Sequence, residues 1–215
     1  MLKYTLSAKE RYKLQEVLKK NKISPYTCYP AFKEAINEII IEGSVPEELH
    51  KFINDSKAYC QEDEPFVFIE GFAVDSILPY FDNYNPVEEK KELKRTYISE
   101  GILELYAQIR NEKPIGYLNV NNGDIFQDIF PKQDLFNSQS QKALNNIYFH
   151  KDLANHFVRP DWVNLLCLRN DIENMIVTCF VRNKDVLSCF SKDELNVLTK
   201  PIFYTPWSGY TFTDS

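Results

Sequence analysis

The sequence has few of the features that mark secreted, membrane or metal-rich proteins. It holds only 3 histidines in 215 residues, and its 5 cysteines are odd in number and include no CxxC pair. No apolar run approaches the roughly 18 residues that a membrane-spanning helix needs. The first residues, Met1-Leu2-Lys3-Tyr4, lack the long apolar stretch of a signal peptide. We therefore expect a cytoplasmic protein without a membrane partner, with reduced cysteines and with Cys167 and Cys179 buried in apolar runs.

The chain also lacks an excess of positive charge, since its 25 Lys and Arg residues are outnumbered by 31 Asp and Glu residues. The net charge of -6 gives no electrostatic reason to expect a nucleic-acid partner. No block of like charge stands out, and the short mixed runs Lys19-Lys20 and Glu88-Glu89-Lys90-Lys91 are interpreted as solvated helix faces. These observations leave a small-molecule enzyme or a protein-binding module as the function classes to weigh.

Material for a packed core is plentiful, since hydrophobic residues make up 44% of the chain and aromatic residues 14%. The length suits one domain, or one domain with a helical extension. We expect a helical N-terminal region over residues 1–60 and a β-rich core over residues 61–215, joined as one domain overall.

Helical patterns dominate the first half of the sequence. Ser7 is a plausible N-cap for a helix that starts near Ala8, and a second helix is opened by Pro30 and stopped by Gly43. A short third helix is expected from Pro46. A longer one is expected around a stripe of apolar residues, namely Ile98, Ile102, Leu105, Tyr106 and Ile109.

Strand-like patterns take over in the second half. The first clear strand is Phe66-Val67-Phe68-Ile69, and a loop follows between Asp75 and Pro86. Further strands are expected over 115–120, 125–130, 146–149, 162–168 and 175–181. Two short helices should close the pattern, one over 184–190 and one opened by the capping-box sequence that starts at Ser191. Helices first and short strands later predict an α+β fold.

The sharpest chemical signal is the pair His150-x-Asp152. Residues two apart on a strand project to the same face, so both side chains can reach one metal ion. His-x-Asp supplies two thirds of the 2-His-1-carboxylate triad of non-haem Fe(II) oxygenases. The spacing alone is a weak signal, because it occurs by chance in many proteins.

The sequence around this pair carries a more specific pattern. His150 to Asp161 reads HKDLANHFVRPD, and the apolar run after it ends in Leu168-Arg169. Two earlier segments accompany it in order, one running from Val45-Pro46 to Leu78-Pro79 and one from Gly116-Tyr117 to Pro131. Together they resemble the clavaminate synthase-like, or TauD-like, Fe(II)/2-oxoglutarate-dependent oxygenases. That family includes β-hydroxylases of free arginine, asparagine and lysine, and the resemblance covers roughly residues 44–205.

The resemblance implies a fold, a reaction and a metal site. The fold is a partial double-stranded β-helix, or jelly roll, with N-terminal helices packed on it. The reaction is hydroxylation of a free amino acid or amino-acid-like substrate with Fe(II) and 2-oxoglutarate as cofactors. His150 and Asp152 would be the iron ligands. A carboxylate at position 152 implies hydroxylation or desaturation, because related halogenases have a small residue there.

Ligand-contacting residues are also implied. Thr178 matches a strand threonine that helps to hold 2-oxoglutarate, although an ordinary β-branched strand residue is an equal alternative. Ser138 and Ser140 lie on the segment that approaches substrate, where loop-capping serines are the alternative. Gln127 would face substrate or, alternatively, solvent.

The sequence departs from the family at its third ligand. The distal His and the Arg that grips 2-oxoglutarate have no counterpart, since the other histidines are His50 and His156. Three interpretations stay open. In the first, the chain is part of a truncated or split oxygenase that is completed by another C-terminal chain or a homodimer partner. In the second, it is a degenerate, non-catalytic homologue that acts as a binding or partner subunit. In the third, a group near the C-terminus, where Asp214 is the one carboxylate beyond Glu194, completes a rearranged site.

Overall fold

The computed structural model describes residues 2–59, 66–81, 84–137, 140, 142–153, 157–170 and 177–203. It divides into two compact units, Met1–Thr178 and Cys179–Ser215, each of which is described by itself. Ser138, His156 and Asp214, which the sequence analysis singled out, lie outside the described residues.

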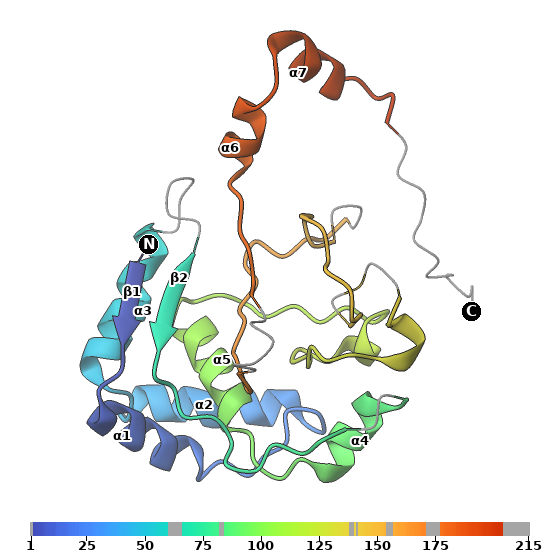
Figure 1. Ribbon diagram of the computed structural model, residues 1–215. Coiled ribbons are helices and arrows are strands. Elements are labelled where there is room, and N and C mark those ends of the chain that lie inside the picture. The colour runs from blue at the N-terminus through green and yellow to red at the C-terminus, as the bar shows by residue number, and fades with distance from the viewer. Residues whose placement is uncertain are drawn as a thin grey trace. The chain divides into compact units, whose positions relative to one another are not determined.

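The first unit combines helices with a small sheet (Figure 1). Its strands are β1 (Leu2–Thr5) and β2 (Val67–Glu70). Its helices are α1 (Ala8–Leu18), α2 (Tyr29–Ile41), α3 (Glu47–Tyr59), α4 (Pro86–Leu93) and α5 (Ile98–Ile109), with single 3-10 turns η1 (Asn121–Gly123) and η2 (Gln133–Leu135). The predicted mixture of helices with some strands is confirmed, and the third helix is longer than expected.

Local sequence signals set several helix boundaries as predicted. Ser7 and Glu10 form a capping box on α1, in which the Glu10 amide donates to Ser7 Oγ at 3.3 Å and the Ser7 amide to Glu10 Oε2 at 2.8 Å. Helix α2 has a proline in its first turn and ends before Gly43, whose φ of 68° favours glycine. The Ser44 amide then donates to the Ile39 carbonyl at 3.2 Å, which completes a Schellman-type stop.

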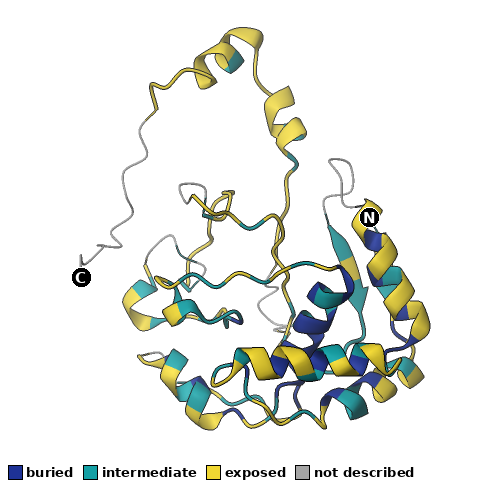
Figure 2. Ribbon diagram, turned by 180° about the vertical axis from the view of Figure 1, so that it is seen from behind, coloured by how far each residue is buried: buried dark blue, intermediate teal, exposed yellow. Residues whose placement is uncertain are grey.

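The core is built around α5, which packs against α1, α2 and α3. Figure 2 shows the buried residues gathered on these helices. Gly101 of α5 allows the closest approach, because a Cβ there would lie 3.0 Å from Leu18 Cδ2. The fully or nearly buried apolar residues all lie between Leu6 and Phe126. The stability of the described structure therefore resides in its helical first half.

The sheet is one parallel pair. Leu2 aligns with Val67 and Thr5 with Glu70, and the Leu6 amide extends the pairing to the Glu70 carbonyl at 2.9 Å. Strand β2 coincides with the strand predicted from Phe66 to Ile69, whereas β1 was not predicted.

The remaining strand predictions are wrong for the residues that the structure describes. Segments 115–120, 125–130, 146–149 and 162–168, and the described part of 175–181, contain no β-strand. Several of their apolar side chains are exposed, such as Phe149 and Leu165. The physical reason is that an extended segment becomes a strand only when a neighbouring strand supplies partners for its backbone groups.

The second unit, over its described residues, contains α6 (Asn183–Ser188) and α7 (Lys192–Leu198). Both helices were predicted, and Ser191 and Glu194 form the predicted capping box on α7. Most described apolar side chains of this unit, among them Leu187 and Phe203, are exposed.

Two expectations about burial are also corrected. Cys167 and Cys179 are free thiols on exposed residues, because the runs that hold them do not form buried strands. Lys90, assigned to a solvated helix face, is buried, because Asp128 and the Phe126 carbonyl provide partners for its ammonium group. No helix in the described ranges is both long and apolar enough to cross a membrane.

Candidate metal site and surrounding polar contacts

The side chains of His150 and Asp152 converge, as their spacing predicts. His150 Nε2 lies 3.2 Å from Asp152 Oδ1, and both side chains are about half exposed. The segment is irregular rather than a strand, and Leu153 follows it with a φ of 50°. The convergence therefore comes from local backbone geometry and not from a sheet.

The second ring nitrogen of His150 fixes how the pair can act. His150 Nδ1 lies 2.7 Å from the Tyr148 carbonyl oxygen, which can only accept a hydrogen bond. Nδ1 must then carry the proton, which leaves Nε2 of the neutral ring with a lone pair directed at the carboxylate. His150 Nε2 and Asp152 Oδ1 then both present lone pairs to each other, so a shared proton or a cation must lie between them at this distance. The donor set fits two positions of a metal site.

A third ligand is not found in the part of the chain that the structure describes. No group of three or more His, Cys, Asp or Glu side chains that could hold a metal ion occurs there. His50 lies on the exposed face of α3. His150 and Asp152 are therefore two side chains of the types that a facial triad uses, and the described residues place no third one beside them.

The predicted ligand-contacting residues fall in two places. Thr178 is exposed in an extended segment. Gln127 and Ser140 are both half-buried, and Ser140 Oγ accepts a hydrogen bond from the Lys142 amide at 3.1 Å. Their roles remain predictions.

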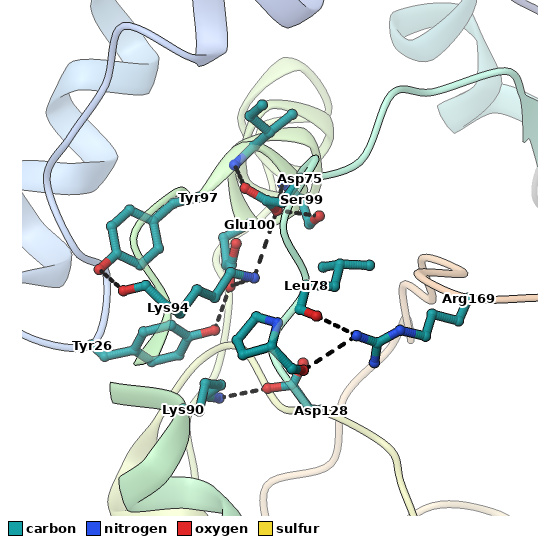
Figure 3. Close-up of polar contacts among 12 residues, drawn as sticks. Tyr26, Asp75, Leu78, Lys90, Lys94, Tyr97, Ser99, Glu100, Asp128 and Arg169 are labelled. Atoms are coloured by element: carbon teal, nitrogen blue, oxygen red, sulfur yellow. Dashed lines mark hydrogen bonds and ion pairs between the residues drawn. The ribbon is translucent and has the colours of Figure 1, made fainter. Parts of the chain in front are cut away.

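A buried polar network at the start of α5 was not predicted. Lys94 Nζ lies 2.6 Å from Glu100 Oε1 and 3.7 Å from Asp75 Oδ2, and Tyr26 donates its hydroxyl proton to Glu100 Oε1 at 2.6 Å. Figure 3 shows Lys94 between these two carboxylates. Burial alone would lower the pKa of Lys94, but attraction to Glu100 and Asp75 outweighs it and raises that pKa. Burial raises the pKa of Glu100.

Asp75 also caps α5. Its Oδ1 accepts from the Ile98 amide at 3.0 Å, and its Oδ2 accepts from the Ser99 amide at 3.1 Å and the Ser99 hydroxyl at 2.6 Å. Burial would raise the pKa of Asp75, yet these hydrogen bonds and Lys94 lower it overall. A carboxylate is favoured at this position because the helix N-terminus carries partial positive charge.

Arg169 connects the segment after the metal motif to the loop that follows Asp75. Its Nη2 donates to the Leu78 carbonyl and to the Pro79 carbonyl, the latter at 3.3 Å (Figure 3). The guanidinium also lies 4.1 Å from the centroid of the Tyr80 ring. The Leu-Pro and Leu-Arg pairs, noted in the sequence as separate motifs, are thus in direct contact.

Known proteins resemble this chain in both sequence and structure. Clavaminate synthase 2 of Streptomyces clavuligerus is 27% identical over 139 residues, which cover 64% of this chain and 41% of that protein. L-asparagine oxygenase of Streptomyces coelicolor is 34% identical over 94 residues, which cover 43% of this chain and 28% of that protein. Over part of its length the chain is thus similar in sequence to clavaminate synthase-like oxygenases. No protein-family model matches it.

Solved oxygenase structures share the fold of this chain over part of their length. An asparagine oxygenase in complex with Fe(II), 2S,3S-3-hydroxyasparagine and succinate aligns with a TM-score of 0.60 at 21% identity, covering 75% of this chain and 49% of that one. The non-heme iron oxygenase OrfP in complex with Fe and alpha-ketoglutaric acid aligns with a TM-score of 0.50 at 19% identity, covering 66% and 43%. The chain thus spans less than half the length of these clavaminate synthase-like relatives.

Proposed function

We propose that this chain is part of an Fe(II)- and 2-oxoglutarate-dependent oxygenase that hydroxylates a free amino acid or an amino-acid-like substrate. The observation that carries the proposal is the convergence of His150 Nε2 and Asp152 Oδ1 at 3.2 Å. It occurs in a chain whose relatives include clavaminate synthase 2 and L-asparagine oxygenase.

Each named residue has a defined task in this proposal. His150 and Asp152 would hold the iron, and the Tyr148 carbonyl would keep the His150 ring oriented with its Nε2 lone pair outward. Iron, when bound with 2-oxoglutarate and dioxygen, would supply the oxidation of a C–H bond to an alcohol, with 2-oxoglutarate converted to succinate and CO2. Thr178 would contact 2-oxoglutarate. Gln127, Ser138 and Ser140 would face substrate.

The rest of the site would come from polypeptide beyond the described residues, either joined to this chain or supplied by a complementing chain or a homodimer partner. We propose that the extended segments after Ile115 then pair into a jelly-roll sheet, with residues 1–60 as its helical support. The alignment with the asparagine oxygenase structure, at a TM-score of 0.60, supports this fold. The proposed compartment is the cytoplasm, where thiols such as Cys167 stay reduced.

Anaerobic titration with Fe(II) tests the metal site directly. Addition of 2-oxoglutarate to the iron-loaded chain should produce the weak visible absorption band of the chelated complex. The band should be lost in His150→Ala and in Asp152→Ala. It should persist in His50→Ala, a matched histidine change on the exposed face of α3. Failure of the wild-type chain to bind iron, or an unchanged band in Asp152→Ala, would refute the proposed site.

A further inference from the structure

The segment from Lys132 to Leu144 closes on itself. The Lys132 amide donates to the Lys142 carbonyl at 2.8 Å, and the Leu144 amide donates to the Phe136 carbonyl at 3.1 Å. Ser140 lies inside this closed segment and accepts from the Lys142 amide. The backbone thereby holds Lys142 beside a residue that the sequence assigns to substrate contact.

Three lysines lie near enough to one another that the charges of Lys132 and Lys90 act on Lys142. Lys132 Nζ pairs with Asp134 Oδ2 at 2.9 Å, and Lys90 Nζ pairs with Asp128 Oδ2 at 3.0 Å. Lys142 is half-buried, and its Nζ donates a hydrogen bond to Asn121 Oδ1 at 3.4 Å. No ion pair within the described ranges includes Lys142, so its charge lacks the carboxylate that each of the other two lysines has.

The charged form of Lys142 is unfavourable in these surroundings unless a further anion lies beside it. Burial lowers the pKa of Lys142 first, and the positive charges of Lys132 and Lys90 lower it further, against the attraction of Asp128 and Asp134. A carboxylate placed against Lys142 would form a charge-assisted hydrogen bond and offset both effects.

The lysine cluster also joins the two segments assigned to substrate contact. Lys90 donates to the carbonyl of Phe126 at 3.2 Å, directly before Gln127. Lys142 is two residues after Ser140. Lys90 therefore contacts both neighbours of Gln127, and Lys142 contacts Ser140.

We propose that Lys142 is a specificity-determining residue that binds a carboxylate group of the enzyme's small-molecule ligand. The identification of that ligand as the amino-acid substrate or 2-oxoglutarate rests on the proposed function, whereas carboxylate binding itself does not. Lys142 would select ligands with a free carboxylate over the corresponding amides, because an amide cannot balance the ammonium charge.

Acetate is the probe for this site. The full chain, without metal, is titrated with sodium acetate and separately with sodium chloride at matched ionic strength, while NMR follows the Lys142 ε-methylene and the Ser140 amide. We expect saturable shifts with acetate alone. Binding should weaken by about tenfold or more in Lys142→Met and be largely retained in Lys142→Arg. Lys132→Met, a matched change at a lysine that already has a carboxylate partner, should bind acetate nearly as well as wild type.

Displacement of acetate then distinguishes the two sources of the carboxylate. Displacement by glycine assigns the site to an amino-acid substrate, and displacement by succinate assigns it to the keto-acid side. Shifts that do not saturate, or that match those in chloride, would overturn the proposal, as would acetate binding by Lys142→Met equal to that of wild type. Because no iron is present, a failure of oxygenase activity leaves this result intact.

Discussion

Lys94 Nζ lies 2.6 Å from Glu100 Oε1, and each side chain is less than 5% exposed, at 3% and 4%. The pair joins the end of α4 to the first turn of α5, around which the core is assembled. A buried ion pair adds little net stability compared with apolar residues, but loss of one partner leaves an uncompensated charge. The main consequence of the Lys94–Glu100 pair is therefore that replacing only one of the two residues destabilises the protein.

Lys94→Met should lower the free energy of unfolding by about 3–5 kcal/mol, because Glu100 would be left buried without its closest cation and would have to stay charged there or take up a proton. Urea denaturation at neutral pH measures the loss. The double variant Lys94→Met/Glu100→Gln should recover part of it, since both charges are removed together. A double variant no more stable than the single one would contradict the assignment of the loss to a stranded charge.

Acidification should destabilise the protein through Asp75. Because the folded pKa of Asp75 is lowered, its carboxylate contributes stability above the unfolded pKa, near 3.9, and this is lost as pH falls through the folded pKa. Asp75→Asn should cost about 1–2 kcal/mol at neutral pH. The difference from wild type should shrink below about pH 4.

Urea titrations at a series of pH values test this dependence. Asp161→Asn, the same change at an exposed residue, serves as the control and should track wild type throughout. The raised pKa of Glu100 favours stability at low pH. Because Glu100 is present in all three proteins, it does not account for differences between them. A constant gap between wild type and Asp75→Asn across the acid range would count against the prediction.

Arg169 should control the local order of residues 75–81 rather than global stability. Arg169→Lys keeps the charge but loses the planar group that reaches the Leu78 and Pro79 carbonyls and faces the Tyr80 ring. Hydrogen exchange in that loop should accelerate by about fivefold, whereas the free energy of unfolding should change by less than about 1 kcal/mol. Arg159→Lys, also exposed, is the matched control, and equal exchange in both variants would refute this role.

Two phenylalanines illustrate the difference in burial between the helical core and the exposed second half of the chain. Phe32 is fully buried and meets Phe126 edge to face, with ring centroids 5.9 Å apart, whereas Phe157 is fully exposed. Phe32→Ala should lower the free energy of unfolding by about 3–5 kcal/mol. Phe157→Ala should change it by less than about 0.5 kcal/mol. Comparable losses in the two variants would contradict the placement of the core.

The features predicted correctly from sequence are those determined by nearby residues. The capping boxes at Ser7 and Ser191 need only the glutamate three positions on, and the end of α2 needs only Gly43. The convergence of His150 with Asp152 is likewise local. Each depends on residues a few positions apart, so the sequence pattern contains the information.

Features that depend on distant partners were missed or misassigned. The burial of Lys90 depends on Asp128, and the contact of Arg169 depends on a loop 90 residues earlier. Segment 162–168 has the residue types of a strand but no strand beside it among the described residues. The sequence held one hint about Lys90, because it lies four residues before Lys94 and therefore on the same side of a helical stretch. The carboxylate partner of either lysine cannot be chosen from this spacing alone.

The pairing of β1 with β2 has a consequence for how the chain folds during synthesis. Thr5 Oγ1 and Glu70 Oε2 are 3.1 Å apart although 65 positions separate them, so the first strand has no sheet partner until β2 has left the ribosome. Helices α1 to α3 emerge in that interval and can associate first. Strand β1, which is translated before these three helices, thus takes its final place only after they have been made.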